Sequence, residues 1–151
     1  MLLLVGLTLV VVGVGILASR HHARQVATAR ARLQADLAGS DIRRIGGARC
    51  VGYEGTGGGV GAIRGPGALG LTGTQLRFVA GRDLRTISIP LDRVVAVFLT
   101  RSFRGSSITP YHRHPVLVVR WVSDVGGNHE VGWSVPEAVV WTTTIDQLVG
   151  C

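Results

Sequence analysis

Three short apolar runs separated by turn residues lie in the middle of the chain, between Gly65 and Leu99. In each run, apolar residues alternate with other positions: Leu69 and Leu71, then Leu76, Phe78 and Ala80, then Ile87 and Ile89. A period of two predicts strands with one buried face. The connections at 72–75 and 81–83 are short enough for hairpin turns. This part of the chain is therefore predicted to be an antiparallel β-meander.

The pattern continues with further strands and one helix. Additional strands are expected at residues 48–53, 94–100, 116–122 and 129–135. Ser134 and Glu137 have the S-x-x-E spacing of a capping box, which predicts a helix after them. The apolar face of that helix would carry Trp141, Ile145 and Leu148. The predicted fold is mainly β: an antiparallel barrel or sandwich of six to seven strands over residues 40–151, capped by a C-terminal helix.

The first nineteen residues follow a different pattern, because residues 2–18 are almost entirely apolar and carry no charge. At 1.5 Å per residue, a helix of this length spans about 27 Å, close to the roughly 30 Å hydrocarbon core of a bilayer. This predicts an uncleaved transmembrane anchor over residues 1–19. The alternative is a cleaved signal peptide, but the segment lacks a basic start and an A-x-A-like cleavage site.

A basic segment, residues 20–39, follows the apolar run and carries Arg20, Arg24, Arg30 and Arg32. The positive-inside rule then places the rest of the chain in the cytoplasm and the N-terminus outside, as in a single-pass inner-membrane protein. The segment is rich in helix formers and has a thin apolar stripe. The stripe consists of Val26, Ala29, Leu33 and Leu37.

Two interpretations of this basic segment remain open. It could be a solvated helix that continues the anchor as a stalk. Alternatively, it could lie against anionic lipid, where each arginine near the surface is worth about 1 kcal/mol. The segment also contributes to the net charge of +7, which comes from sixteen arginines and no lysine. Because so much of this charge follows the apolar run, no nucleic-acid partner is expected.

The remaining local motifs argue against bound cofactors. A glycine-rich stretch at 51–67 has G-x-G-x-x-G-like spacing, but no helix follows it and the chain has no lysine for a phosphate-binding loop. We therefore expect a flexible loop there and no nucleotide. Cys50 and Cys151 are expected to be free thiols in a reducing compartment, because they form no C-x-x-C pair.

The best candidate binding site is a polar loop over residues 101–114. Binding residues often lie on loops held by a rigid scaffold. The residues expected to contact a partner or lipid are Arg101, Phe103, Arg104, Tyr111, His112 and Arg113. The alternative is a solvated loop without a specific role. His112 and His114 could ligate a metal, but no acidic residue or cysteine lies near them in sequence, so no metal is expected.

Several local sequences add a family resemblance to this pattern. They are R-G-P-G-A-L-G-L-T at 64–72, L-R-F at 76–78, I-x-I-P-L-D-R-V at 87–94, V-L-V-V-R-W at 116–121, and a final helix with Trp141. With six or seven strands and one terminal helix, the chain resembles the membrane-anchored bacterial proteins of the pleckstrin-homology (PH)-like superfold that are common in actinobacteria. The resemblance covers about residues 48–148. It implies a binding or scaffolding module beside the membrane and supplies no catalytic residues.

The sequence therefore predicts a non-catalytic, membrane-tethered PH-like adaptor that docks a protein partner, expected to be a membrane protein. The alternative is a module that binds anionic lipid through the 20–39 segment and the 101–114 loop. An enzyme is the third hypothesis, because no nucleophile constellation or catalytic motif is recognisable.

Overall fold

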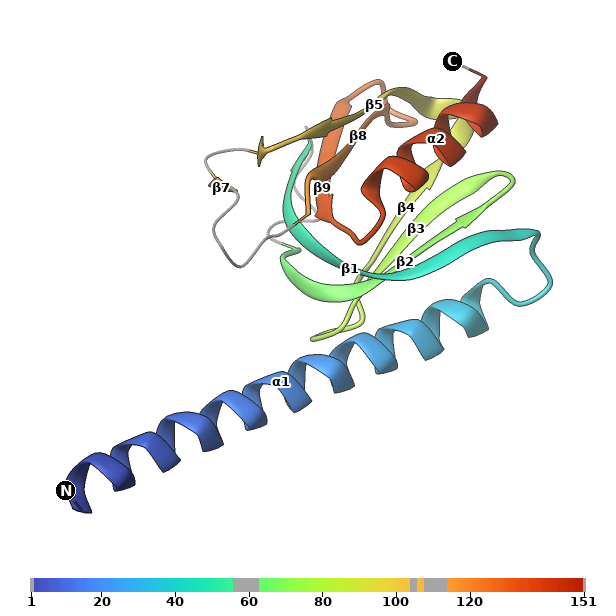
Figure 1. Ribbon diagram of the computed structural model, residues 1–151. Coiled ribbons are helices and arrows are strands. Elements are labelled where there is room, and N and C mark those ends of the chain that lie inside the picture. The colour runs from blue at the N-terminus through green and yellow to red at the C-terminus, as the bar shows by residue number, and fades with distance from the viewer. Residues whose placement is uncertain (1, 56–62, 104–105, 108–113, 151) are drawn as a thin grey trace.

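The computed structural model describes residues 2–55, 63–103, 106–107 and 114–150, with side chains described from residue 17 onward except at 55, 106 and 107. The chain is mainly β, with one helix at each end (Figure 1). The helices are α1 (Leu2–Asp36) and α2 (Ala138–Val149), with a 3₁₀ turn η1 (Leu91–Arg93). The strands are β1 (Ile42–Gly55), β2 (Gly65–Thr72), β3 (Gln75–Ala80), β4 (Thr86–Pro90), β5 (Val94–Thr100), β6 (Ser102–Phe103), β7 (Ser106–Ser107), β8 (Val116–Val122) and β9 (Asn128–Ser134).

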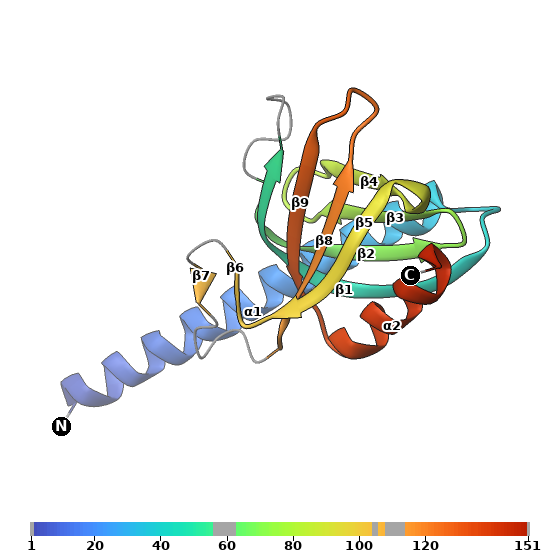
Figure 2. The ribbon, with the colours of Figure 1, turned by 90° about the horizontal axis from the view of Figure 1, so that it is seen from above.

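Seven strands form one antiparallel sheet in the order β4-β3-β2-β1-β9-β8-β5, and β6 and β7 form a separate small hairpin. The long strand β1 joins the two halves of the large sheet. Its first part, residues 42–50, pairs with β2, and its last part, residues 49–55, pairs with β9. Figure 2 shows β1 running beneath both sets of strands. The strand begins six residues earlier than its sequence pattern indicated.

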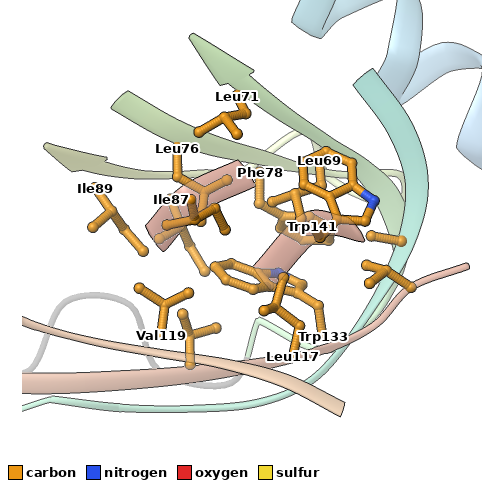
Figure 3. Close-up of a cluster of buried hydrophobic side chains, with 14 of the residues drawn as sticks. Leu69, Leu71, Leu76, Phe78, Ile87, Ile89, Leu117, Val119, Trp133 and Trp141 are labelled. Carbon is orange, nitrogen blue, oxygen red and sulfur yellow. The ribbon is translucent and has the colours of Figure 1, made fainter. Parts of the chain in front are cut away.

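The predicted meander is confirmed, and its alternating apolar residues form the core. Leu69 lies opposite Phe78 and Leu71 opposite Leu76, so the inward positions of β2 and β3 are in register. These side chains face Trp133 of β9 and Trp141 of α2 (Figure 3). The rings of Phe78 and Trp133 have centroids 6.0 Å apart, a tilted arrangement that aromatic pairs favour.

Helix α2 packs against β5, β8 and η1, with Trp141 and Ile145 almost fully buried, as the sequence predicted. The predicted capping box, however, is wrong. Glu137 has a left-handed backbone conformation (φ 54°), and no side chain caps the helix. The Glu137 carboxylate instead pairs with Arg44 of β1, whose guanidinium also lies 5.3 Å from the Trp141 ring centroid. The carboxylate that the capping box would need therefore binds Arg44, a residue of β1 that is distant in the sequence.

The sheet is open, which corrects the predicted barrel or sandwich: the strands do not close into a barrel. Its two edges are β4 and β5, which follow one another in the chain but do not pair. Between them, Pro90 lacks an N–H group and η1 turns the chain away from β4. Helix α2 contacts both η1 and β5 on this side. The edges of β4 and β5 therefore remain unpaired with each other.

Helix α1 crosses the outer face of β1, β2 and β3 with its C-terminal half, and its N-terminal half extends past the sheet (Figure 1). Ala29, Leu33 and Leu37 are completely buried against Ala68 and Val79. The predicted apolar stripe is therefore confirmed. It is covered by the chain's own sheet, which neither interpretation of the 20–39 segment anticipated.

Among the residues that the structure describes, no helix is both long enough and apolar enough to cross a bilayer. This overturns the predicted anchor at residues 1–19. The membrane tether, the single-pass inner-membrane location with an outside N-terminus, and the integral membrane contact depended on that anchor and are corrected with it.

Candidate functional site

The predicted 101–114 site lies largely outside the described residues. Arg104, Tyr111, His112 and Arg113 lie outside the described residues, as do residues 56–62 of the glycine-rich stretch and Cys151. Arg101 is exposed and described. The structure therefore does not bring the predicted loop residues together, and their role stays a prediction.

Phe103, a further member of the predicted site, is only 4% exposed. It packs with Val51, Val116 and Val118 on the outer face of the sheet. The ring covers two glycines: a Cβ atom at Gly132 would lie 3.0 Å from it, and one at Gly52 3.1 Å. Phe103 therefore fills a shallow trough between strands, and in this position it is not available to a partner.

The four arginines of the basic segment differ in their surroundings. Arg20, Arg24 and Arg30 are exposed. The Arg32 Nε donates to the Asp36 Oδ1 at 3.0 Å, one turn further along α1. Sequence reasoning did not pair Arg49 of β1 with Arg30; the two residues share a groove because α1 lies across β1. Only the tertiary fold brings these two residues together.

Strand β5 offers a second surface that the sequence did not single out. It pairs with β8 on one side, and no described strand pairs with its other side. Its sequence, VVAVFLT, contains no charge and no proline. The opposite edge, β4, is shorter and ends in Pro90. Natural edge strands usually carry charges, prolines or bulges that discourage further pairing. β5 has only a register shift between Val94 and Ala96.

Two large apolar side chains of β5 are exposed to solvent. Val95 is 53% exposed and Phe98 is 37% exposed. The Arg120 guanidinium lies 5.8 Å from the Phe98 ring centroid and donates two hydrogen bonds to Glu130, at 2.6 and 2.9 Å. Helix α2, which packs against β5, adds exposed Val139 and Val140. This edge therefore combines unpaired backbone with apolar side chains.

A polar cluster lies near the other end of the core. The Tyr53 hydroxyl is 2.6 Å from the His129 Nδ1, and the His129 ring stacks on Trp121 with centroids 5.2 Å apart. Partial burial raises the pKa of Tyr53. Among the described residues, no three His, Cys, Asp or Glu side chains gather as metal ligands would.

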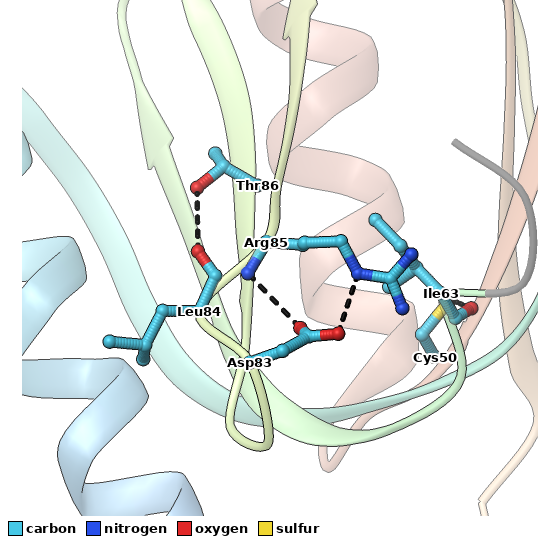
Figure 4. A network of polar contacts seen from close by, with 6 residues as sticks. All are labelled: Cys50, Ile63, Asp83, Leu84, Arg85 and Thr86. Carbon is cyan, nitrogen blue, oxygen red and sulfur yellow. Dashed lines mark hydrogen bonds and ion pairs between the residues drawn. The ribbon is translucent and has the colours of Figure 1, made fainter. Parts of the chain in front are cut away.

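Cys50 is the only cysteine with a described environment, and it is buried. Its thiol donates to the Ile63 carbonyl oxygen at 3.1 Å (Figure 4). Burial raises the pKa of the Cys50 thiol to about 12. Because the thiolate is the reactive form, this cysteine is a poor nucleophile at neutral pH.

Comparison with known proteins identifies the fold and no function. No family model and no curated protein matches the chain. Among solved structures, the chain is similar to the crystal structure of the C-terminal domain of an unknown protein from Leishmania infantum. The two are 14% identical with a TM-score of 0.51, over 78% of this chain and 92% of that one. At this identity the likeness extends to the fold alone.

Proposed function

We propose that this protein is a non-catalytic, PH-like docking module that binds an extended segment of a partner protein along β5. The PH-like assignment is supported by the order of elements, a four-stranded meander followed by three further strands and one packed C-terminal helix. The observation that carries the docking function is the uncharged, proline-free β5 edge with exposed Val95 and Phe98.

A segment bound at this edge gains two kinds of contact. Its backbone forms hydrogen bonds with the unpaired side of β5, as in other cases of strand addition. Its alternate side chains can contact exposed apolar positions such as Val95 and Phe98. Backbone pairing provides affinity for extended chains in general, and the side-chain contacts select apolar residues at alternate positions.

The test is site-specific photo-crosslinking in cells that express the full chain from its own gene. A photoreactive benzoylphenylalanine is placed at position 95, and in a matched control at position 125. Val125 is 90% exposed in the turn that follows β8, the strand next to β5, and it lies outside the β5 edge itself. We expect a discrete crosslinked protein from position 95 only.

A double variant, Val95→Lys with Phe98→Lys, supplies the second arm of the test. Both side chains are exposed, so the fold should tolerate the change, whereas two charges on the edge should prevent pairing. Loss of the position-95 partner in pull-downs of this variant, with retention in Val125→Lys, supports the proposal. Equal crosslinking from positions 95 and 125, or none from position 95, contradicts it.

A further inference from the structure

A groove runs along the side of α1, where the helix lies over β1. It has a volume of about 530 Å³. One wall comes from α1, the floor from β1, and the far side from the segment that connects β9 to α2. Helix and sheet are in close contact at its base, since a Cβ atom at Gly47 would lie 3.2 Å from a Val26 methyl group.

The chemistry of the lining is apolar with a basic rim. Small or apolar residues, including Val26, Ala27 and Pro136, form most of the surface. The charged or titratable members are His22 and Arg30 from α1 and Arg49 from β1, and none of the described residues that line the groove is acidic. Basic side chains from both α1 and β1 therefore border an otherwise largely apolar lining.

The two groove arginines differ from most arginines of the sheet, which have acidic partners. Arg44 pairs with Glu137, Arg85 with Asp83, and Arg120 with Glu130. Within the described part of the chain, the side chains of Arg30 and Arg49 form no ion pair or hydrogen bond. The groove thus presents uncompensated positive charge in a protein whose net charge is already +7.

We infer that this groove binds an acidic peptide segment of a partner protein, with apolar side chains between its carboxylates. The carboxylates would accept paired hydrogen bonds from the Arg30 and Arg49 guanidinium groups, a geometry that arginine provides. An apolar side chain between them would be buried against Val26 and Ala27. A simple phosphate would leave this apolar floor unused. The site is separate from the β5 edge, so the inference stands whether or not that edge binds a strand.

The experiment measures binding of a fluorescent peptide that repeats Asp-Leu-Glu to the full chain, by fluorescence anisotropy across a salt series. A peptide that repeats Asn-Leu-Gln is the uncharged control. We expect the acidic peptide to bind, the control not to bind, and the affinity to fall as salt screens the charges. Arg30→Gln and Arg49→Gln should each weaken binding about tenfold, as expected for the loss of a charge-assisted hydrogen bond.

Two further variants separate the groove from general positive charge. Arg82→Gln removes one exposed arginine from the β3–β4 turn and should leave binding within about twofold of wild type. Ala27→Trp keeps every charge but fills the groove from an exposed position, and it should abolish binding.

Three outcomes would overturn the inference. One is that the acidic peptide does not bind the wild-type chain at low salt. A second is that Arg82→Gln weakens binding as much as Arg49→Gln, or that Ala27→Trp leaves it intact, because charge alone would then account for the signal. A third is that phosphatidylglycerol vesicles bind through Arg30 and Arg49 and displace the peptide, which would make a lipid surface the ligand.

Discussion

Single glycines determine how closely the strands and side chains of this protein approach one another. Gly67 in β2 is the tightest case, because a Cβ atom there would lie 2.2 Å from the Val79 carbonyl oxygen and 2.6 Å from the Phe78 ring. No real Cβ atom fits at such distances. The β3 backbone and the Phe78 ring can therefore occupy their positions only because residue 67 has a hydrogen atom in place of a side chain.

Gly67→Ala should therefore lower the free energy of unfolding by about 3 kcal/mol, at the upper end of the usual cost of overpacking. Urea denaturation measures this value. The matched control is Gly73→Ala in the β2–β3 turn, where the nearest atom would be the Asp41 Oδ2 at 3.5 Å, an ordinary contact. Its effect should stay within about 0.5 kcal/mol. Equal destabilisation by both variants would show that the close approach at Gly67 is not the cause.

Because of the Cys50 thiol, the free energy of unfolding should decrease at alkaline pH. Its pKa is raised to about 12 in the folded state, above the ordinary value of 9.0, so the unfolded chain loses this proton first. The contribution of the protonated Cys50 thiol to the free energy of unfolding is fully present below pH 9. It is lost as the pH rises from 9 towards 12, by about 1.4 kcal/mol per pH unit at most.

The measurement compares urea denaturation of the Cys151→Ser chain with that of Cys50→Ala in the same background, between pH 8 and about 10.5. Stability should fall more steeply while Cys50 is present, because Tyr53 and the other groups titrate in both proteins. At pH 8 a thiol reagent should label folded Cys50 far more slowly than the unfolded chain. Parallel pH profiles, or fast labelling of the folded state, would count against a buried neutral thiol.

Among the elements, those with a strict local period could be predicted from sequence. The alternation in residues 69–89 predicted β2, β3 and β4, and the spacing of Trp141 and Ile145 predicted the buried face of α2. The capping box failed because Arg44, far away in sequence, binds the Glu137 carboxylate. The groove was missed for the same reason, since Arg30 and Arg49 meet only when α1 lies on β1.

Helix α1 illustrates this limit further. Its stripe was recognisable, but the surface that covers it was not, because a stripe of small residues fits many partners. Gly70 explains part of this packing. A Cβ atom there would lie 2.9 Å from Leu37 and 3.0 Å from Leu33, so the absence of a side chain on Gly70 lets these two leucines pack close to β2. The C-terminal half of α1 therefore packs directly on the sheet.

Leu33→Ala should consequently destabilise the whole domain by about 3 kcal/mol, as for other leucines truncated in a core. The midpoint of urea denaturation, followed by tryptophan fluorescence, measures the loss. Val125→Ala, at a 90% exposed position, is the control and should have almost no effect. If the two variants were equally neutral, α1 would not be docked on the sheet in solution.

In the whole molecule, the two halves of the sheet should unfold as one unit. They share β1, and one continuous core contains residues of both halves, with Leu69 from β2 and Val119 from β8. All three tryptophans lie in the C-terminal part of the chain, on β8, β9 and α2. Their fluorescence therefore reports on that part and on the side chains of the other half that contact it, such as Phe78.

Leu69→Ala changes the other half of the sheet, but it should still shift the urea midpoint measured by tryptophan fluorescence. The shift should match that of Val119→Ala once the smaller side chain of valine is taken into account. Small single domains usually unfold in one step, so the fluorescence transition should coincide with the exposure of Cys50 in β1 to a thiol reagent. Val139→Ala, at an exposed position of α2, serves as the control. Separate transitions for fluorescence and thiol exposure would contradict a shared core.

The position of β1 also affects the order in which the chain can fold. Residues 49–55 pair with residues 129–134, so this part of β1 keeps one side unpaired until residues 129–134 have left the ribosome. Bringing these two segments together closes a long loop, and the entropy of the loop is lost before the contacts between the strands form. Such non-local pairing slows folding. The nascent meander would meanwhile expose the core faces of Leu69 and Phe78, which makes this the interval in which a chaperone would matter most.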